Sequence, residues 1–273
     1  MAKDSKIEWT HHTFNPWWGC IKVSPACNNC YAEAWAKRVG SKVWGPKAPR
    51  RFFSDAHWKE PLKWNREAEI TGKRYRVFCA SMADVFERKA ELRADRERLW
   101  DIIAQTPQLD WLMLTKRPQN IKSMAPWDDN SWPLNVWMGT TVENQHWVDK
   151  RVPFLAQSGA RIKFLSCEPL LGHIDLSDWM KHNQIDWVIA GGESGAKSRP
   201  MSPQWVRSLR DQCQEYKVAF HFKQWGHWAP VELLTSEQKE TLMFDGFRMA
   251  AAGKKIAGRD LDERTWDEFP KIA

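Results

Sequence analysis

The sequence predicts an α/β protein built as a partial or near-complete (βα)6–7 TIM-like barrel with parallel strands. Three observations predict this class. Short apolar runs recur along the chain, amphipathic helical segments separate them, and polar residues follow each run. Near-continuous apolar runs of about five residues are typical of strands buried on both faces, as in a parallel sheet. A regular β–α alternation, with no Gly/Ser-rich linker dividing it, favours a single barrel.

The individual elements follow in chain order. A first strand is expected near Thr13–Phe14, and six further strands are expected at 76–80, 111–115, 136–140, 162–166, 187–191 and 218–222. Helices are expected between them at 31–39, 91–105, 143–157 and 203–216. Pro153 marks a point where the third of these helices could break, because proline lacks a backbone N–H. Ser202 is the expected N-cap of the fourth, with Pro203 at its first helical position.

The chain is expected to have two parts. Residues 1–230 form the barrel, with a basic, proline-containing insertion at about 40–72 between the first two strands. Residues 231–273 form a C-terminal extension packed on the barrel. This extension lacks a strong strand pattern, so helices and loops are expected there, with a last piece near 260–269.

Composition bounds the location and the partners. The chain has 273 residues, 42% of them hydrophobic, and a net charge of +7 that favours a polyanionic partner such as nucleic acid. No stretch approaches the roughly 18 apolar residues of a membrane span, and the N-terminus leads into no signal region. We therefore expect a cytoplasmic protein with reduced thiols and no membrane contact. The 19 tryptophans either stack on bases or pack the ends of the barrel.

Three cysteines, Cys20, Cys27 and Cys30, lie within eleven residues of a polar stretch after the first expected strand. A structural zinc site or a closed iron–sulfur site needs four ligands, so three thiols indicate an open metal position. This favours a [4Fe–4S] cluster with one iron left for a small molecule. Buried free thiols, a disulfide and a zinc site remain as alternatives, the zinc site being completed by His11, His12 or His57. The remaining cysteines interrupt apolar runs and are expected to pack in the core: Cys79, Cys167 and Cys213.

Polar residues follow the expected strands. Because the carboxyl ends of parallel strands meet at one edge of a sheet, these side chains are expected to form a charged pocket. They are Ser81, Asp84, Lys116, Arg117, Thr140, Glu143, Glu168, Glu193, Arg199, Lys223 and Trp225. The alternative is that the charged members form salt bridges that tie neighbouring loops together.

Several motifs carry a family resemblance. They are Trp17–Cys20, Cys27–Ala32, Leu114–Pro118, Glu168–Leu171, Gly191–Gly195 and Phe222–Gly226. With these motifs the chain resembles a three-cysteine family of unknown function that is common in phages and mobile elements. It also resembles radical S-adenosylmethionine (SAM) enzymes. The resemblance spans nearly the whole chain. It implies a cytoplasmic location in a bacterial or phage-infected cell.

The resemblance also implies roles for particular residues. A [4Fe–4S] cluster would be held by Cys20, Cys27 and Cys30, with SAM on the fourth iron and an external electron donor. The expected cofactor-binding residues are Ser81, Asp84, Thr140, Glu143, Arg151 and Tyr31. The candidate catalytic residues are Lys223, Glu168 and Glu193. The candidate substrate-binding residues are Lys116, Arg117, Arg199 and Trp225.

The expected activity is cleavage of SAM to a 5′-deoxyadenosyl radical that acts on nucleic acid or a nucleotide, in base repair or modification. Basic charge and tryptophan content favour that substrate class. Two alternatives stay open. One is a metal-stabilised nucleic-acid-binding protein without SAM chemistry. The other is radical modification of a protein or peptide partner.

Overall fold

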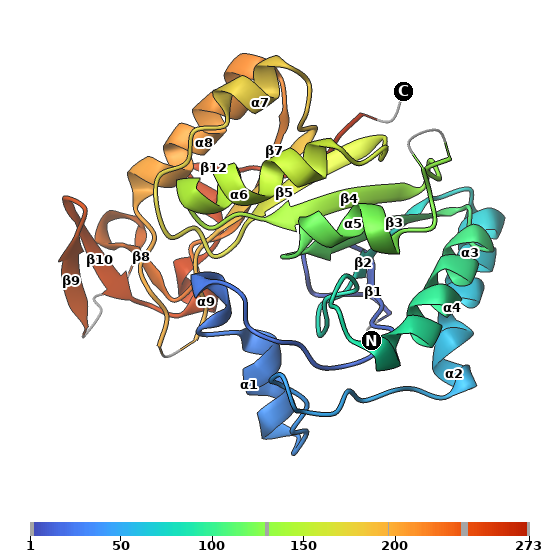
Figure 1. Cartoon of the computed structure of the whole chain (residues 1–273). Coiled ribbons are helices and arrows are strands. Elements are labelled where there is room, and N and C mark those ends of the chain that lie inside the picture. Colours follow the sequence, from blue (N-terminus) through green and yellow to red (C-terminus); the bar gives the residue numbers. More distant parts are fainter. Residues whose placement is uncertain (1–2, 129–130, 196, 236–239, 272–273) are drawn as a thin grey trace. The chain divides into compact units, whose positions relative to one another are not determined.

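The computed structural model describes residues 3–128, 131–195, 197–235 and 240–271 (Figure 1). Seven strands form one sheet in the order β1-β2-β3-β4-β5-β6-β7, which is their order in the sequence. The pairings of β1 through β4, and those of β5 through β7, are parallel. The predicted fold class, an α/β protein with the strand order of a partial TIM-like barrel, is confirmed.

The chain divides into two compact units. Unit 1 comprises 1–23, 32–140 and 153–163, and unit 2 comprises 24–31, 141–152 and 164–273. The boundary crosses β4 (Val136–Thr141), β5 (Ile162–Cys167) and α6 (Gln145–Ala156).

Unit 1 contains the first strands of the parallel sheet. These are β1 (His12–Thr13), β2 (Tyr75–Cys79), β3 (Leu109–Thr115) and most of β4. Its helices are α1 (Tyr31–Arg38), α2 (Asp55–Trp58), α3 (Glu60–Thr71), α4 (Arg93–Ala104) and α5 (Ile121–Met124), with 3₁₀ turns at Ala90–Leu92 and Pro118–Asn120. Val77, Trp111 and Leu112 are fully buried, as expected for strands covered on both faces. The apolar runs therefore became strands where the sequence placed them.

Unit 2 contains most of β5, together with β6 (Trp187–Gly191) and β7 (Ala219–Gln224). A 3₁₀ turn at Pro25–Cys27 precedes them, and α7 (Ser177–Lys181) and α8 (Pro203–Tyr216) run alongside each other (Figure 1). Helix α8 begins as predicted. Its N-cap Ser202 accepts a hydrogen bond from the Gln204 N–H at 3.2 Å.

The C-terminal segment differs from expectation. In its described residues it holds a three-stranded sheet in the order β8-β10-β9, a two-stranded sheet of β11 and β12, a 3₁₀ turn at Val231–Leu233 and one short helix, α9 (Lys254–Ala257). The strands are β8 (Trp228–Pro230), β9 (Thr241–Phe244), β10 (Phe247–Ala251), β11 (Asp260–Leu261) and β12 (Arg264–Thr265). The expectation of helices and loops was wrong. These strands are 2 to 5 residues long, which is too short for an alternating apolar pattern to mark them in the sequence.

A turn signal for one of these hairpins was present in the sequence. Strands β9 and β10 are joined by Asp245 and Gly246, which both have positive φ, at 50° and 82°. An Asp-Gly pair with this conformation is a preferred two-residue hairpin turn. Residues after β12 also bond to β7, since the Phe222 N–H donates to the Trp266 carbonyl at 3.0 Å.

Helix α6 does not break at its proline. The helix continues through Pro153, and its residues Val148 and Val152 are fully buried. Packing of that apolar face outweighs the one backbone hydrogen bond that proline removes. Among the described helices, none is both long and apolar enough to cross a membrane.

Most tryptophans whose role the sequence left open are packing residues. Trp9, Trp17, Trp58, Trp64, Trp111, Trp187 and Trp225 are each less than 2% exposed. For these seven, the structure favours core packing over base stacking. Trp35 differs, because it is 43% exposed.

Candidate functional site

The three clustered cysteines lie on the cysteine loop, which we define as residues 20–30. Cys20 belongs to unit 1, whereas Cys27 and Cys30 belong to unit 2. All three are free thiols and only partly buried. The disulfide alternative is therefore not what the structure shows. Cys79, Cys167 and Cys213 are buried, which confirms their predicted packing role.

The start of the loop is fixed by a close backbone approach. Gly19 has a φ of 118°, and a Cβ there would lie 2.3 Å from the Val43 carbonyl oxygen. Only glycine tolerates both conditions. The Gly45 N–H then donates to the Cys20 carbonyl at 2.9 Å, so the main chain at Cys20 is tied to a neighbouring segment of unit 1.

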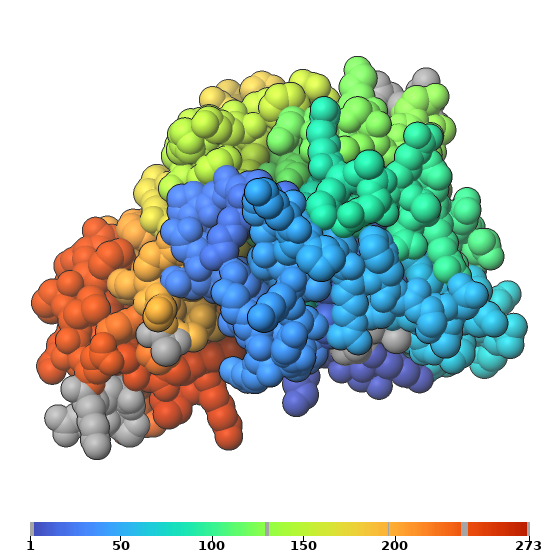
Figure 2. All heavy atoms as spheres, turned by 60° about the horizontal axis from the view of Figure 1, so that its bottom comes forward, coloured from blue at the N-terminus to red at the C-terminus, as the bar shows by residue number. Residues whose placement is uncertain are grey.

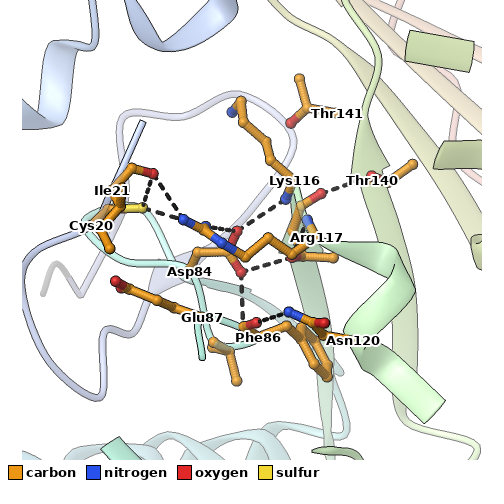
Figure 3. Close-up of polar contacts among 12 residues, drawn as sticks. Cys20, Ile21, Asp84, Phe86, Glu87, Lys116, Arg117, Asn120, Thr140 and Thr141 are labelled. Carbon is orange, nitrogen blue, oxygen red and sulfur yellow. Dashed lines mark hydrogen bonds and ion pairs between the residues drawn. The ribbon is translucent and has the colours of Figure 1, made fainter. Parts of the chain in front are cut away.

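Arg117 and Asp84 hold the Cys20 end of the loop (Figure 3). The guanidinium pairs with Asp84 at 2.7 Å, donates to the Ile21 carbonyl at 2.8 Å and approaches Cys20 Sγ at 3.7 Å. Asp84 also accepts from the Thr115 hydroxyl at 2.7 Å and the Lys116 N–H at 3.1 Å. Burial raises the pKa of the Cys20 thiol to about 12, with the nearby Arg117 opposing the rise.

The other predicted residues of unit 1 are engaged locally. Ser81 accepts from the Asn15 side-chain amide at 3.0 Å. The Thr140 hydroxyl is fully buried and donates to the Thr115 carbonyl at 2.8 Å, so it serves the sheet. Lys116 is half-buried and contributes its N–H to Asp84.

In unit 2, Glu143 holds the middle of the loop. The Ala26 N–H donates to Glu143 Oε1 at 3.2 Å, and Arg151 pairs with Oε2 at 2.9 Å. Arg151 also donates to the Thr141 carbonyl at 2.8 Å and lies over the Trp147 ring at 3.9 Å. Glu143 is fully buried, so both its oxygens are committed to protein contacts next to Cys27.

A second carboxylate of unit 2, Glu193, holds the segment between the last two cysteines. Arg199 donates to its two oxygens at 2.6 and 2.9 Å, and the Asn29 amide donates to it at 3.0 Å. Arg199 also reaches the Pro25 carbonyl at 3.0 Å. Burial favours the protonated carboxyl, but the hydrogen bonds from Arg199 and Asn29 outweigh it and lower the pKa of Glu193.

Glu168 and Lys223 form an ion pair of a different kind. Their charged atoms are 2.8 Å apart, and the side chains are 14% and 18% exposed. Ser166 donates to the other Glu168 oxygen at 3.2 Å. A Cβ on Gly191 would lie 3.2 Å from Glu168 Oε1, so glycine leaves room for the carboxylate. Within the described chain, neither side chain bonds to the cysteine loop.

The two predicted aromatic contacts have contrasting environments. Tyr31, at the start of α1, is 57% exposed. Trp225 is 1% exposed, and its indole N–H donates to the Asp260 carbonyl at 2.8 Å. Trp225 is therefore a packing residue of unit 2 in this structure, and its predicted contact with substrate remains only a prediction.

Sequence reasoning missed three polar residues. Asn15 and Asn29 bond to the predicted site residues Ser81 and Glu193. Thr141 Oγ1 is buried and makes no hydrogen bond to any residue that the structure describes. The adjacent threonines at the end of β4 were the available signal, because successive strand residues point to opposite faces and only one can serve the sheet as Thr140 does.

The charged residues thus separate into two groups. Asp84 with Arg117, Glu143 with Arg151, and Glu193 with Arg199 bind the main chain of the cysteine loop. This is the loop-tying arrangement that the sequence left open as an alternative. Glu168 with Lys223 stands apart from it. Over residues 3–128, 131–195, 197–235 and 240–271, no group of three or more His, Cys, Asp or Glu side chains has the arrangement of a metal site.

A family model described as "Protein of unknown function (DUF5131)" matches residues 4–270. The match covers nearly the whole chain, so the chain belongs to this family. None of the curated proteins matches the sequence.

Proposed function

We propose that this member of the DUF5131 family is an iron–sulfur, radical SAM-type enzyme that acts on nucleic acid or a nucleotide in base repair or modification. One observation carries the proposal. Three free thiols lie on a loop that follows the first strand of a parallel sheet, and charged residues that follow later strands bind this loop. When bound, a [4Fe–4S] cluster with SAM would supply the hydrogen-abstracting radical chemistry.

The chemistry of the three thiols supports an anionic cluster with three protein ligands, whereas in the described residues they do not have the arrangement of a metal site. Cys20, Cys27 and Cys30 are partly exposed thiols, and the Arg117 guanidinium lies 3.7 Å from Cys20 Sγ. A cation beside a sulfur favours its thiolate form, and hydrogen bonds to ligand sulfur tune a cluster. Such neighbours also fix how a ligand is oriented.

The histidines that could complete a zinc site each contact other residues of unit 1, although His12 Nε2 is buried and bonds to no described residue. His11 Nδ1 accepts from the Arg76 N–H at 2.8 Å, and His12 stacks on Trp64 at 4.5 Å between ring centroids. His57 Nε2 lies 2.8 Å from the Asn15 carbonyl, and its ring stacks on Phe53. These contacts support three protein ligands over a zinc site with a histidine.

The chain's own residues take two kinds of role. Asp84, Glu143 and Glu193 act through their arginine partners and the loop main chain, so they position the cysteines. Lys223 is proposed to hold an anionic group of the substrate, and Glu168 to accept or hold a proton at its carboxylate. Both remain partly accessible while paired at 2.8 Å.

The proposal is tested by anaerobic reconstitution with iron and sulfide, followed by metal analysis and electron paramagnetic resonance with and without SAM. We expect about four irons per chain and a reduced-cluster signal that changes when SAM is added. Cys27→Ser should abolish the signal. The matched control Val23→Ala, at an exposed position of the same loop, should keep it.

Two results would contradict the proposal. Stoichiometric zinc without iron would favour a metal-stabilised nucleic-acid-binding protein. A cluster whose signal is indifferent to SAM would remove the radical chemistry and leave the metal as a structural element.

A further inference from the structure

A strongly basic segment of unit 1 runs from within α1 to the residue before the N-cap of α2. We call residues 34–53 the basic strap. It carries six basic residues and neither Asp nor Glu, and its basic residues are Lys37, Arg38, Lys42, Lys47, Arg50 and Arg51. All of these except Arg50 are exposed. In Figure 2 this segment, blue to light blue, lies on the surface turned toward the viewer.

Three exposed basic residues of the strap, Arg38, Lys42 and Lys47, form no ion pair with a carboxylate of the described chain, whereas Lys37 does. Lys37 pairs with Glu33, which also pairs with Lys22. Surface cations without a carboxylate partner attract the phosphates of a polyanion, so Arg38, Lys42 and Lys47 are the candidate phosphate contacts.

Two aromatic side chains of the strap are exposed. Trp35 is 43% exposed and Phe52 is 45% exposed, in a chain that buries most of its large aromatic side chains. Trp35 meets the buried Trp18 edge-on at 5.1 Å between ring centroids. The Arg51 guanidinium lies over the same Trp18 ring at 4.6 Å, so the charge and the exposed indole share one surface.

The strap is held in place by its one buried cation. Arg50 pairs with Glu87, donates to the Ala48 carbonyl at 2.8 Å and donates to the Val43 carbonyl at 3.1 Å. The backbone of Arg51 bonds to that of Trp18 in both directions, at 2.9 and 3.0 Å. An anchored surface loses less conformational entropy when a ligand binds.

This surface adjoins the cysteine loop. The strap's Gly45 N–H donates to the Cys20 carbonyl at 2.9 Å, and Gly19 has no room for a Cβ against the strap's Val43. A polyanion on the strap would therefore run beside the first of the three cysteines.

We propose that the basic strap binds single-stranded nucleic acid, with Arg38, Lys42 and Lys47 contacting phosphates and Trp35 and Phe52 stacking on bases. Exposed rings favour a single strand over a duplex, because duplex bases are already stacked on each other. The exposed rings also distinguish the basic strap from a surface that attracts phosphates by charge alone. The inference rests on the proposed function, since it names the substrate class of that same site.

Binding of a fluorescein-labelled single-stranded DNA oligonucleotide of mixed sequence to the full chain, measured by anisotropy without SAM, tests the inference. The triple variant Arg38→Glu, Lys42→Glu, Lys47→Glu should lose at least about 30-fold in affinity, and its log–log salt slope should fall by about 2. Phe52→Ala alone should lose about tenfold through lost stacking. Duplex DNA of the same sequence should bind more weakly than the single strand.

The matched control is Arg66→Glu, Lys73→Glu, Lys122→Glu, which makes the same charge change at exposed positions of unit 1 outside the strap. It should bind nearly as the parent does. Equal losses in both triple variants, or an unchanged affinity in Phe52→Ala, would overturn the inference. So would stronger binding to phosphatidylserine-containing vesicles than to the oligonucleotide.

The two proposals fail separately. If the strap variants bind the oligonucleotide like the parent while the cluster signal responds to SAM, the strap inference is wrong and the proposed function stands. If the chain holds zinc but the strap variants lose affinity as expected, the radical chemistry is wrong and the binding surface stands.

Discussion

Two ion pairs of unit 2 differ sharply although both follow strands of the parallel sheet. Glu143 and Arg151 are buried, with side chains 0% and 3% exposed, and they also bond the main chain at Ala26 and Thr141. Glu168 and Lys223 are 14% and 18% exposed and bond chiefly to each other. In the first pair, one oxygen of Glu143 accepts from the Ala26 N–H of the cysteine loop and the other pairs with Arg151. The second retains capacity for something outside the protein.

The difference gives a rule for reading charged residues after strands. A buried carboxylate whose two oxygens are both occupied by protein groups is holding structure, and removing its partner leaves a charge without compensation. A pair that solvent can reach is screened, so its loss costs little stability. The sequence does not separate the two kinds of carboxylate, because Glu143 and Glu168 both come shortly after a strand.

The largest expected effect is at the buried pair. Arg151→Met should lower the free energy of unfolding by about 3–5 kcal/mol, because Glu143 is then buried without its counterion. Urea denaturation followed by tryptophan fluorescence measures it. The double variant Glu143→Gln, Arg151→Met should recover part of the loss. A single-variant loss below about 1 kcal/mol would contradict the assigned role.

The next largest effect is expected at Arg117, which contacts the sulfur of Cys20 and the Ile21 carbonyl. Arg117→Lys keeps the charge near Asp84 but loses the planar set of donors that reaches Ile21 and Cys20. We expect a loss of about 1–2 kcal/mol in stability. Alkylation of Cys20 in the metal-free protein should be slower, because the hydrogen bond from Arg117 favours the reactive thiolate. Arg66→Lys, at an exposed position, serves as control. Unchanged alkylation in Arg117→Lys would show that the guanidinium does not position the thiol.

A pH experiment separates Glu193 from ordinary surface carboxylates. Its pKa is lowered below the usual 4.5, so its stabilisation is present above about pH 4.5 and is lost as the pH falls through the lowered value. Arg199→Met removes the main donor. Between pH 6 and pH 3, the free energy of unfolding should therefore fall by about 1 kcal/mol less in the variant than in the parent. Urea denaturation at each pH measures this difference. Parallel curves for the two proteins would refute the assignment.

The smallest stability effect is expected at the accessible pair. Lys223→Met should lower the free energy of unfolding by about 1 kcal/mol, less than Arg151→Met, because water reaches Glu168 in part and can partly replace its counterion. Its iron content after reconstitution should match the parent. If stability falls as far as in Arg151→Met, the two pairs do not differ and Lys223 is a structural residue.

Much of the architecture could be predicted from local sequence. The six apolar runs became β2 through β7, and Ser202 caps α8, because strand burial and capping depend on neighbouring residues. The C-terminal strands were missed, since strands of 2 to 5 residues are too short to show an alternating pattern and the Asp245–Gly246 turn marked just one hairpin. Pro153 was tolerated in α6 because packing outweighed a local rule.

The sequence by itself determined the parallel α/β class, the three clustered thiols and the set of charged residues after the strands. These follow from periodicity and spacing along the chain. Only the tertiary structure decided which charged side chains are bound by protein groups. It pairs Glu143 with Arg151 and the Ala26 N–H, and it leaves the pair of Glu168 and Lys223 partly exposed. It also decided that the basic strap lies against the backbone of Cys20. Burial and hydrogen-bond partners come from residues far apart in the sequence, so no local pattern encodes them.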